Sequence, residues 1–317
     1  MLAVAGISAL WGSQFWIGVG LLTVIYGIFT AGLQLNIGVT GIYNFAQSGL
    51  MAIGAYSMAI LVVSAGWSFW AALPVAAMIA MAAALVVGMP ALRLRGDYFA
   101  IVTIAASEMI VYVIQNAQSL TGGTVGLIGY NTQWSQLSTS ISNAFGLSSQ
   151  EFLVPLLLVG AVALILTLVV LGTLNRTPWG RVLRAIREDE YAARALGKRV
   201  FRYQAQSLAI CALLAAVSGY LLALDLASLS PGEFTTDNTF IALAMLLVGG
   251  LGTYRGVILG SLIVEFILQA TQSINLPLSD AHIGALRFVI VGVALVAFAA
   301  WRPQGALGSR EEMGLRK

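Results

Sequence analysis

Charge is scarce in this sequence. Of its 317 residues, 9% are Asp, Glu, Lys or Arg and 59% are apolar, and the mean hydropathy is +0.90. A soluble domain carries about 25% charged residues, so the composition excludes an ordinary cytosolic enzyme. It also excludes a disordered chain, which requires low hydrophobicity and high net charge. The stretch from Met1 to Leu92 has no charged residue, and no water-facing surface can be built from it. We therefore expect the chain to lie in a membrane.

Cysteine and histidine are almost absent. Cys211 and His282 are the single residues of their types, which excludes an intrachain disulfide and a structural zinc or haem site. Leu196-Gly197-Lys198-Arg199 lacks both the first Gly and the Ser or Thr of a nucleotide-binding GxxxxGK[ST] loop. We therefore expect this chain to be no enzyme, to bind no cofactor or metal, and to have no nucleic-acid partner.

Long apolar runs make up most of the chain. A helix needs about 20 apolar residues to cross about 30 Å of hydrocarbon, and the runs between charges and turn residues predict nine such helices. The predicted fold is an all-α integral membrane protein, a polytopic bundle of about nine transmembrane helices. The predicted spans are 15–37, 45–65, 68–89, 97–117, 152–173, 203–224, 238–253, 256–275 and 283–301.

The positions of the basic residues predict the orientation. Cytoplasmic loops carry an excess of Lys and Arg, and eight basic residues lie between Arg176 and Arg202. If this segment is cytoplasmic, nine spans place 15 of the 16 Lys and Arg on the inner side, with Arg287 inside the last span. The N-terminus is then outside and the C-terminus cytoplasmic.

The charged segment 174–202 contains one predicted amphipathic helix. Thr177 and Pro178 suit its start, and Gly197 suits its end. Arg184 with Glu188, and Glu190 with Arg194, have the spacing of ion pairs along a helix. The apolar side chains fall largely on one face: they are Val182, Leu183, Ile186, Ala193 and Leu196. The segment either follows anionic lipid headgroups or docks its apolar patch of Leu183, Ile186 and Leu196 into a groove of a cytosolic partner.

Four stretches resemble one family of membrane proteins. GRVLRAIREDEYAARALGKRV (Gly180–Val200) is similar to the cytoplasmic coupling segment of branched-chain amino acid ABC importer permeases of the LivM type. PALRLRGDYFAIVTIA (Pro90–Ala105) resembles the start of the family's middle helix, and LTGGTVGLIG (Leu120–Gly129) resembles its outer loop. AMLLVGGLGTYRGVILGSLIVE (Ala244–Glu265) resembles its late glycine-rich helix pair. GIYNFAQSGLMAIGAY (Gly41–Tyr56) is more similar to the sister LivH-type subunit.

The resemblance implies that the chain is one subunit of a larger transport complex. Residues 1–317 would form a single permease domain in a bacterial inner membrane, paired with a second, LivH-type permease. Two LivG/LivF-type ATPases would bind ATP and magnesium, and a periplasmic protein would deliver a branched-chain or other neutral amino acid. Close relatives carry urea or short amides, which is the alternative substrate class. Membrane lipid is the remaining expected partner.

The resemblance also assigns candidate residues. The cytoplasmic helix would transmit closure of the ATPases to the spans, and the outer loop 118–151 would be either a docking site for the binding protein or a flexible tether. Polar groups inside the spans would line the passage, some of them near a helix break expected at Gly38–Gly41 and two carboxylates in the middle of their spans, although Glu265 could instead pair with Arg287. The coupling candidates are Arg181, Arg184, Arg187, Glu188, Asp189, Glu190, Ala193, Leu196 and Gly197. The passage candidates are Asn36, Asn44, Gln47, Glu108 and Glu265, and the docking candidates are Thr121, Gly122 and Gly123.

Two other classes of function remain as rivals. An ion-coupled secondary transporter should show clustered acidic groups and an inverted repeat, whereas this sequence has scattered single charges. A membrane-embedded enzyme should carry groups for metal or nucleophilic chemistry, and no such motif is present.

Overall fold

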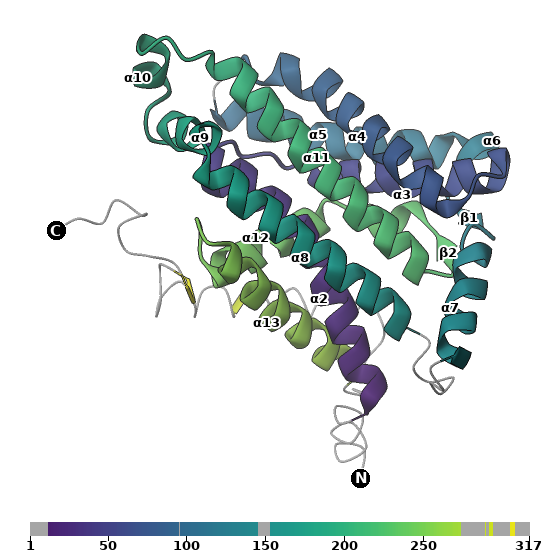
Figure 1. Cartoon of the computed structure of the whole chain (residues 1–317). Helices are drawn as coiled ribbons and strands as arrows, with labels where there is room; N and C mark the ends of the chain where they lie inside the picture. Colours follow the sequence, from purple (N-terminus) through teal and green to yellow (C-terminus); the bar gives the residue numbers. More distant parts are fainter. Residues whose placement is uncertain are drawn as a thin grey trace.

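The computed structural model describes residues 12–94, 96–144, 153–273, 289, 292–293 and 305–307. Helices dominate this part of the chain (Figure 1). The long helices are α2 (Ser13–Leu33) with its π-helical continuation η1 (Gln34–Thr40), α3 (Gln47–Ala65), α4 (Phe69–Ala91), α5 (Gly96–Asn116), α8 (Val154–Arg176), α11 (Val200–Asp225) and α13 (Tyr254–Ser273). The shorter elements are α6 (Gln118–Thr121), β1 (Leu127–Ile128), α7 (Thr132–Ala144), α9 (Pro178–Glu188), α10 (Glu190–Ala195), β2 (Ser228–Leu229), η3 (Pro231–Phe234) and α12 (Asp237–Gly249).

Seven helices in the described part are long and apolar enough to cross a membrane, with α2 and η1 forming one continuous span of 28 residues. They match seven of the nine predicted spans, and the protein is a multi-pass membrane protein. The expectation at 238–253 is wrong in one respect, because α12 has only 13 residues and rises about 20 Å. It is too short to span alone. The predicted span at 283–301 and Arg287 lie outside the described residues.

Helix α11 occupies the centre of the bundle, where it packs against α2, α3 and α4. Small residues allow this close packing: a Cβ atom at Gly54 of α3 would lie 2.4 Å from the Cα atom of Ala216. Between membrane helices, small residues let backbones approach and so maximise van der Waals contact. Helices α5 and α8 lie at the periphery, and only about a third of the most apolar stretch of each helix is buried.

The connecting segments gather at two opposite ends of the bundle (Figure 1). Helices α9 and α10 lie at one end, and α6, α7 and the paired strands lie at the other. Strand β1 pairs antiparallel with β2, Leu127 opposite Leu229. The basic segment 174–202 and the segment that follows α5 are therefore at opposite ends of the bundle. The alternation of the predicted spans across the membrane requires this placement.

The first span ends in an irregular backbone. Its last turns are π-helical, Gly41 adopts the left-handed conformation at a φ of 79°, and helix α3 resumes only at Gln47. The break expected at Gly38–Gly41 is thus confirmed. Short π-helical stretches are rare and occur frequently at functional sites, which directs attention to the side chains beside this break.

Candidate functional site

The basic segment folds into two short helices rather than the single helix that was predicted. Helix α9 starts at Pro178 as expected but ends at Glu188. Asp189 is extended, with φ −156° and ψ 107°, and its carboxylate accepts hydrogen bonds from the backbone N–H groups of Tyr191 (2.8 Å) and Ala192 (3.0 Å). An aspartate that satisfies these amides starts a new helix, so Asp189 divides the segment.

The apolar face of α9 and α10 points into the protein's own bundle. Leu183 is fully buried in the main core, and Ile186 packs with Ala193 and Val200. Leu196, by contrast, is 79% exposed. The predicted patch of Leu183, Ile186 and Leu196 therefore does not exist as a docking surface, and the coupling candidate Ala193 is likewise buried. The twist introduced at Asp189 turns Leu196 away from the other two.

The outward face of α9 and α10 is polar with two large apolar side chains, Tyr191 and Leu196. Glu190 and Arg194 form the expected ion pair. Arg184 instead donates to the carbonyl oxygen of Asn175 at 3.1 Å. The other coupling candidates that are exposed here are Arg181, Glu188, Asp189 and Gly197.

Arg187 connects this segment to the helix break. It is half-buried, and its guanidinium donates a hydrogen bond to the carbonyl oxygen of Gly38 in η1. Next to it, a Cβ atom at Gly41 would lie 3.1 Å from the side chain of Arg187. Helix α9 therefore contacts the irregular end of the first span directly, and a hydrogen bond to a charged donor stabilises that contact by about 1.5–3 kcal/mol.

A buried polar cluster lies next to this contact and shares η1 with it. Three predicted passage residues, Asn36, Asn44 and Gln47, are fully buried in it. Ser207 Oγ donates to Asn36 Oδ1 at 2.8 Å and lies 2.8 Å from Thr40 Oγ1. The amide cluster, as we call it, consists of Asn36, Thr40, Asn44, Gln47, Ser207 and Cys211.

Helix α11 supplies the part of the amide cluster that the sequence interpretation missed. Cys211 donates to Gln47 Oε1 at 2.6 Å, and Gln47 Nε2 donates to the carbonyl oxygen of Phe29 at 3.2 Å. Ser207 and Cys211 are four residues apart on one helix face, which is the sequence signal that could have identified them.

A second polar group, the junction of α3, α5 and α12, lies farther along the bundle. Ser48 Oγ donates to the carbonyl oxygen of Thr235 at 2.7 Å, and the N–H of Gly49 donates to Ser107 Oγ at 2.9 Å. Thr236 donates to the carboxylate of Glu108. The starts of two helices, α3 and α12, thus meet against the polar side of α5.

The depth of this junction follows from Glu108. It is the thirteenth residue of the 21-residue helix α5, about 18 Å from its start, and its side chain is exposed at the bundle surface. A carboxylate costs about 2.5–3.5 kcal/mol at the centre of a membrane helix. The backbone immediately before α3 and α12 is non-helical, and such backbone inside a membrane occurs where it is buried in protein or lines water. The face of α5 that carries Glu108 therefore does not suit contact with lipid.

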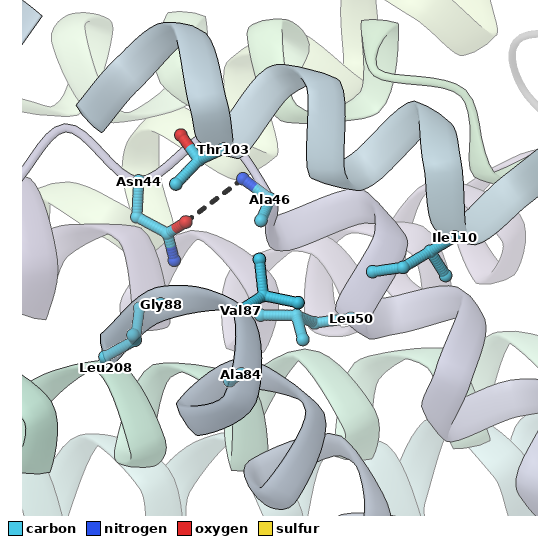
Figure 2. A pocket seen from close by; sticks show the side chains of 9 residues that line it. All are labelled: Asn44, Ala46, Leu50, Ala84, Val87, Gly88, Thr103, Ile110 and Leu208. Carbon is cyan, nitrogen blue, oxygen red and sulfur yellow. Dashed lines mark hydrogen bonds between the residues drawn. The ribbon is translucent and has the colours of Figure 1, made fainter. Parts of the chain in front are cut away.

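A pocket lies beside Asn44 of the amide cluster (Figure 2). Asn44 and Thr103 line it together with apolar side chains from α3, α4, α5 and α11, and Asn44 Oδ1 accepts from the N–H of Ala46 at 3.0 Å. The cavity volume is about 10 Å³, which is close to the space that one water molecule needs. The pocket is too small to hold an amino acid.

Glu265 is separate from both polar groups. It lies in α13 and is 2% exposed, and its neighbours Val264 and Leu268 pack against Met245 and Tyr26. Its expected partner Arg287 lies outside the described residues. The structure therefore does not bring Glu265 together with the other four passage candidates.

At the other end of the bundle, the docking candidates form a turn. Thr121 is buried and donates to the carbonyl oxygens of Ile114 (2.6 Å) and Ala117 (2.8 Å). Gly122 has a φ of 72°, and a Cβ atom there would lie 2.1 Å from the carbonyl oxygen of Gly126. These residues shape the turn, while the side chains that it exposes are Leu120, Val125 and Ile128.

The described part of the loop, residues 118–144, forms α6, β1 and α7 and packs against the bundle. Tyr130 is fully buried and donates to the carbonyl oxygen of Leu226 at 2.8 Å, and burial raises the pKa of its phenol. Trp134 of α7 packs edge-on against Phe69 at 5.8 Å. Residues 145–151 of the predicted loop lie outside the described residues.

Comparisons with known proteins identify the family. Residues 16–299 match the family model described as branched-chain amino acid transport system / permease component. The chain is 33% identical to the permease LivM of Escherichia coli over 92% of this chain and 69% of the relative. It is 28% identical to a probable LivM of Methanocaldococcus jannaschii over 69% and 62%, respectively. Identity to Escherichia coli LivH is 29% over 90% and 92%. No solved structure matches the chain.

Proposed function

Since the chain belongs to the branched-chain amino acid transport permeases and is of the LivM type, we propose that it is one of two membrane subunits of an ATP-driven importer. It would work in the inner membrane with a LivH-type partner, two ATPases and a periplasmic binding protein. The substrate would be a branched-chain or other neutral amino acid. ATP and magnesium would bind to the ATPases.

One observation carries this proposal: a surface segment is joined to an irregular part of a membrane span. Helices α9 and α10 expose a polar face with Tyr191 and Leu196, and on the opposite side Arg187 reaches the carbonyl oxygen of Gly38. A partner that moves α9 therefore moves η1, which carries Asn36 and Thr40 of the amide cluster. Such a contact would couple the ATPases to the amide cluster inside the bundle.

The passage is proposed to run along the exposed side of α5. Two helices begin at the junction, and the half-length helix α12 resembles the discontinuous helices at transporter substrate sites. Glu108 is exposed on that side of α5 and accepts a hydrogen bond from Thr236 at the junction. The LivH-type partner would complete the passage, because a membrane carboxylate requires protein or water around it.

The test is reconstitution. The chain would be purified with its LivH-type partner and two ATPases, placed in liposomes with the binding protein, and supplied with radioactive leucine. Accumulation should require ATP hydrolysis and the binding protein. Uptake driven by an ion gradient without ATP would instead identify a secondary transporter.

The same liposomes test the substrate class. Leucine, isoleucine and valine should compete with the labelled substrate, whereas urea and short amides should not. Competition by urea alone would overturn the amino acid assignment and leave the ATP-driven mechanism standing.

A further inference from the structure

A basic cleft opens beside the first turns of α11, and of its lining residues only Gly197 is among the candidates assigned above. Its volume is about 420 Å³, within the usual range of ligand pockets. Its lining residues are Trp179, Gly197, Lys198, Arg199, Arg202, Tyr203 and Gln206. Three of these are cations, and no described lining residue is acidic. The geometry points to a binding site for the anionic headgroup of a phospholipid.

The depth of the cleft favours a lipid. Trp179 follows the end of α8 at Arg176 by three residues, and α11 begins at Val200, so the cleft lies where two spans leave the membrane. Gln206 is about 9 Å along α11. A protein that docks from the aqueous side would meet the outward face of α9 and α10 first, whereas a headgroup lies at the level of the cleft itself.

The side chains suit a phosphate group in that position. Arg199 and Arg202 offer guanidinium forks, which pair bidentately with phosphate oxygens, and Lys198 adds a point charge. The indole N–H of Trp179 donates to Gln206 Oε1 at 2.8 Å, which holds the ring at the edge of the cleft. Trp and Tyr are enriched at this level of a membrane, where the ring meets acyl chains and headgroups.

The proposed site rests on the proposed function only for its sidedness, because the cytoplasmic leaflet carries the anionic lipids that attract Lys and Arg. The occupant is a lipid with net negative charge, such as phosphatidylglycerol. Binding there would hold the start of α11 at the membrane surface, seven residues before Ser207 of the amide cluster.

The experiment is native mass spectrometry of the purified full-length chain, titrated with phosphatidylglycerol or phosphatidylcholine. One phosphatidylglycerol should bind at least about tenfold more tightly than phosphatidylcholine, and Arg199→Gln/Arg202→Gln should remove about tenfold of this affinity. The matched control Arg93→Gln/Arg255→Gln removes the same charge from exposed positions outside the cleft and should change the affinity less than twofold.

Three results would overturn the site. Equal losses in the two double variants would mean general charge attraction, and displacement of the lipid by millimolar inorganic phosphate would mean a soluble anion site. Unchanged lipid binding with weakened ATPase binding would make the cleft part of the protein interface. Trp179→Ala keeps all the charges and should also weaken phosphatidylglycerol binding, so the site can be tested if the double variant misfolds. None of these outcomes alters the transport assay, which tests the proposed function separately.

Discussion

The guanidinium of Arg187 donates a hydrogen bond to a backbone carbonyl oxygen, that of Gly38. The acceptor belongs to the π-helical end of the first span. Because the acceptor is a backbone atom, a displacement of α9 moves the backbone of η1. This transmission does not depend on which side chains η1 carries. This contact is where the surface segment and the membrane interior meet.

Arg187→Gln should therefore uncouple the importer. The shorter neutral side chain cannot reach Gly38 with a charged donor, and loss of about 1.5–3 kcal/mol of contact energy corresponds to at least a tenfold loss of leucine uptake. ATP hydrolysis by the assembled complex should continue without stimulation by the loaded binding protein. Both rates are measured in the liposomes described above.

Arg176→Gln is the matched control for that variant, because Arg176 is an exposed arginine at the end of the neighbouring helix α8. It should keep normal uptake. The charge exchange Arg187→Glu/Glu188→Arg preserves net charge but not the bond to Gly38, and should behave like Arg187→Gln. Normal uptake and normal ATPase stimulation in the exchanged variant would contradict the coupling role.

Leu196 and Leu183 should respond to mutation in opposite ways. Leu196 is exposed, so Leu196→Ala should leave the melting temperature within about 2 °C but weaken co-purification of the ATPases. Leu183 is fully buried, and Leu183→Ala should lower the free energy of unfolding by about 2–5 kcal/mol. It should not weaken ATPase binding, because the exposed side chains of α9 and α10 are unchanged. Thermal unfolding and pull-down measurements separate the two, and ATPase binding that survives loss of both Leu196 and Tyr191 side chains would place the docking surface elsewhere.

Glu108 should matter for transport more than for stability. Glu108→Gln keeps an acceptor for Thr236 but removes a charge that costs about 2.5–3.5 kcal/mol inside a membrane. The variant should melt at the same or a higher temperature, while leucine uptake falls at least about tenfold. Thr236→Val keeps the carboxylate and should reduce uptake less. A variant that melts earlier but transports normally would show that Glu108 serves the packing of the two permeases.

The apolar runs predicted the membrane helices well because each run is a local property: about 20 residues without charge suffice. The break at Gly38–Gly41 was also local, since glycines and a polar stretch interrupt a single run. Helix α7 escaped prediction for the converse reason. It is polar, and it is held by Trp134 against Phe69 and by Gln133, which bonds to Trp67 and Phe69.

The candidate site was predicted in part. Asn36, Asn44 and Gln47 stood out because amides are rare in apolar runs, but their partners on α11 come from more than 160 residues away along the chain. The direction of α9 was predicted wrongly because amphipathicity identifies an apolar face without saying what covers it. Here the bundle itself buries Leu183 and Ile186, and only the tertiary structure reveals this.

Cys211 offers a direct measure of whether the amide cluster opens. It is the single cysteine of the chain and is fully buried beside Gln47, so maleimide should label the resting complex slowly. If transport parts η1 from α11, addition of ATP and loaded binding protein should raise the labelling rate at least about tenfold, because a thiol reacts only when reagent reaches it. Labelling is followed by the mass of the intact chain, and Cys211→Ser provides the blank. Arg187→Gln should abolish the increase. If the thiol stays unreactive throughout turnover that accumulates leucine, the amide cluster does not open during transport.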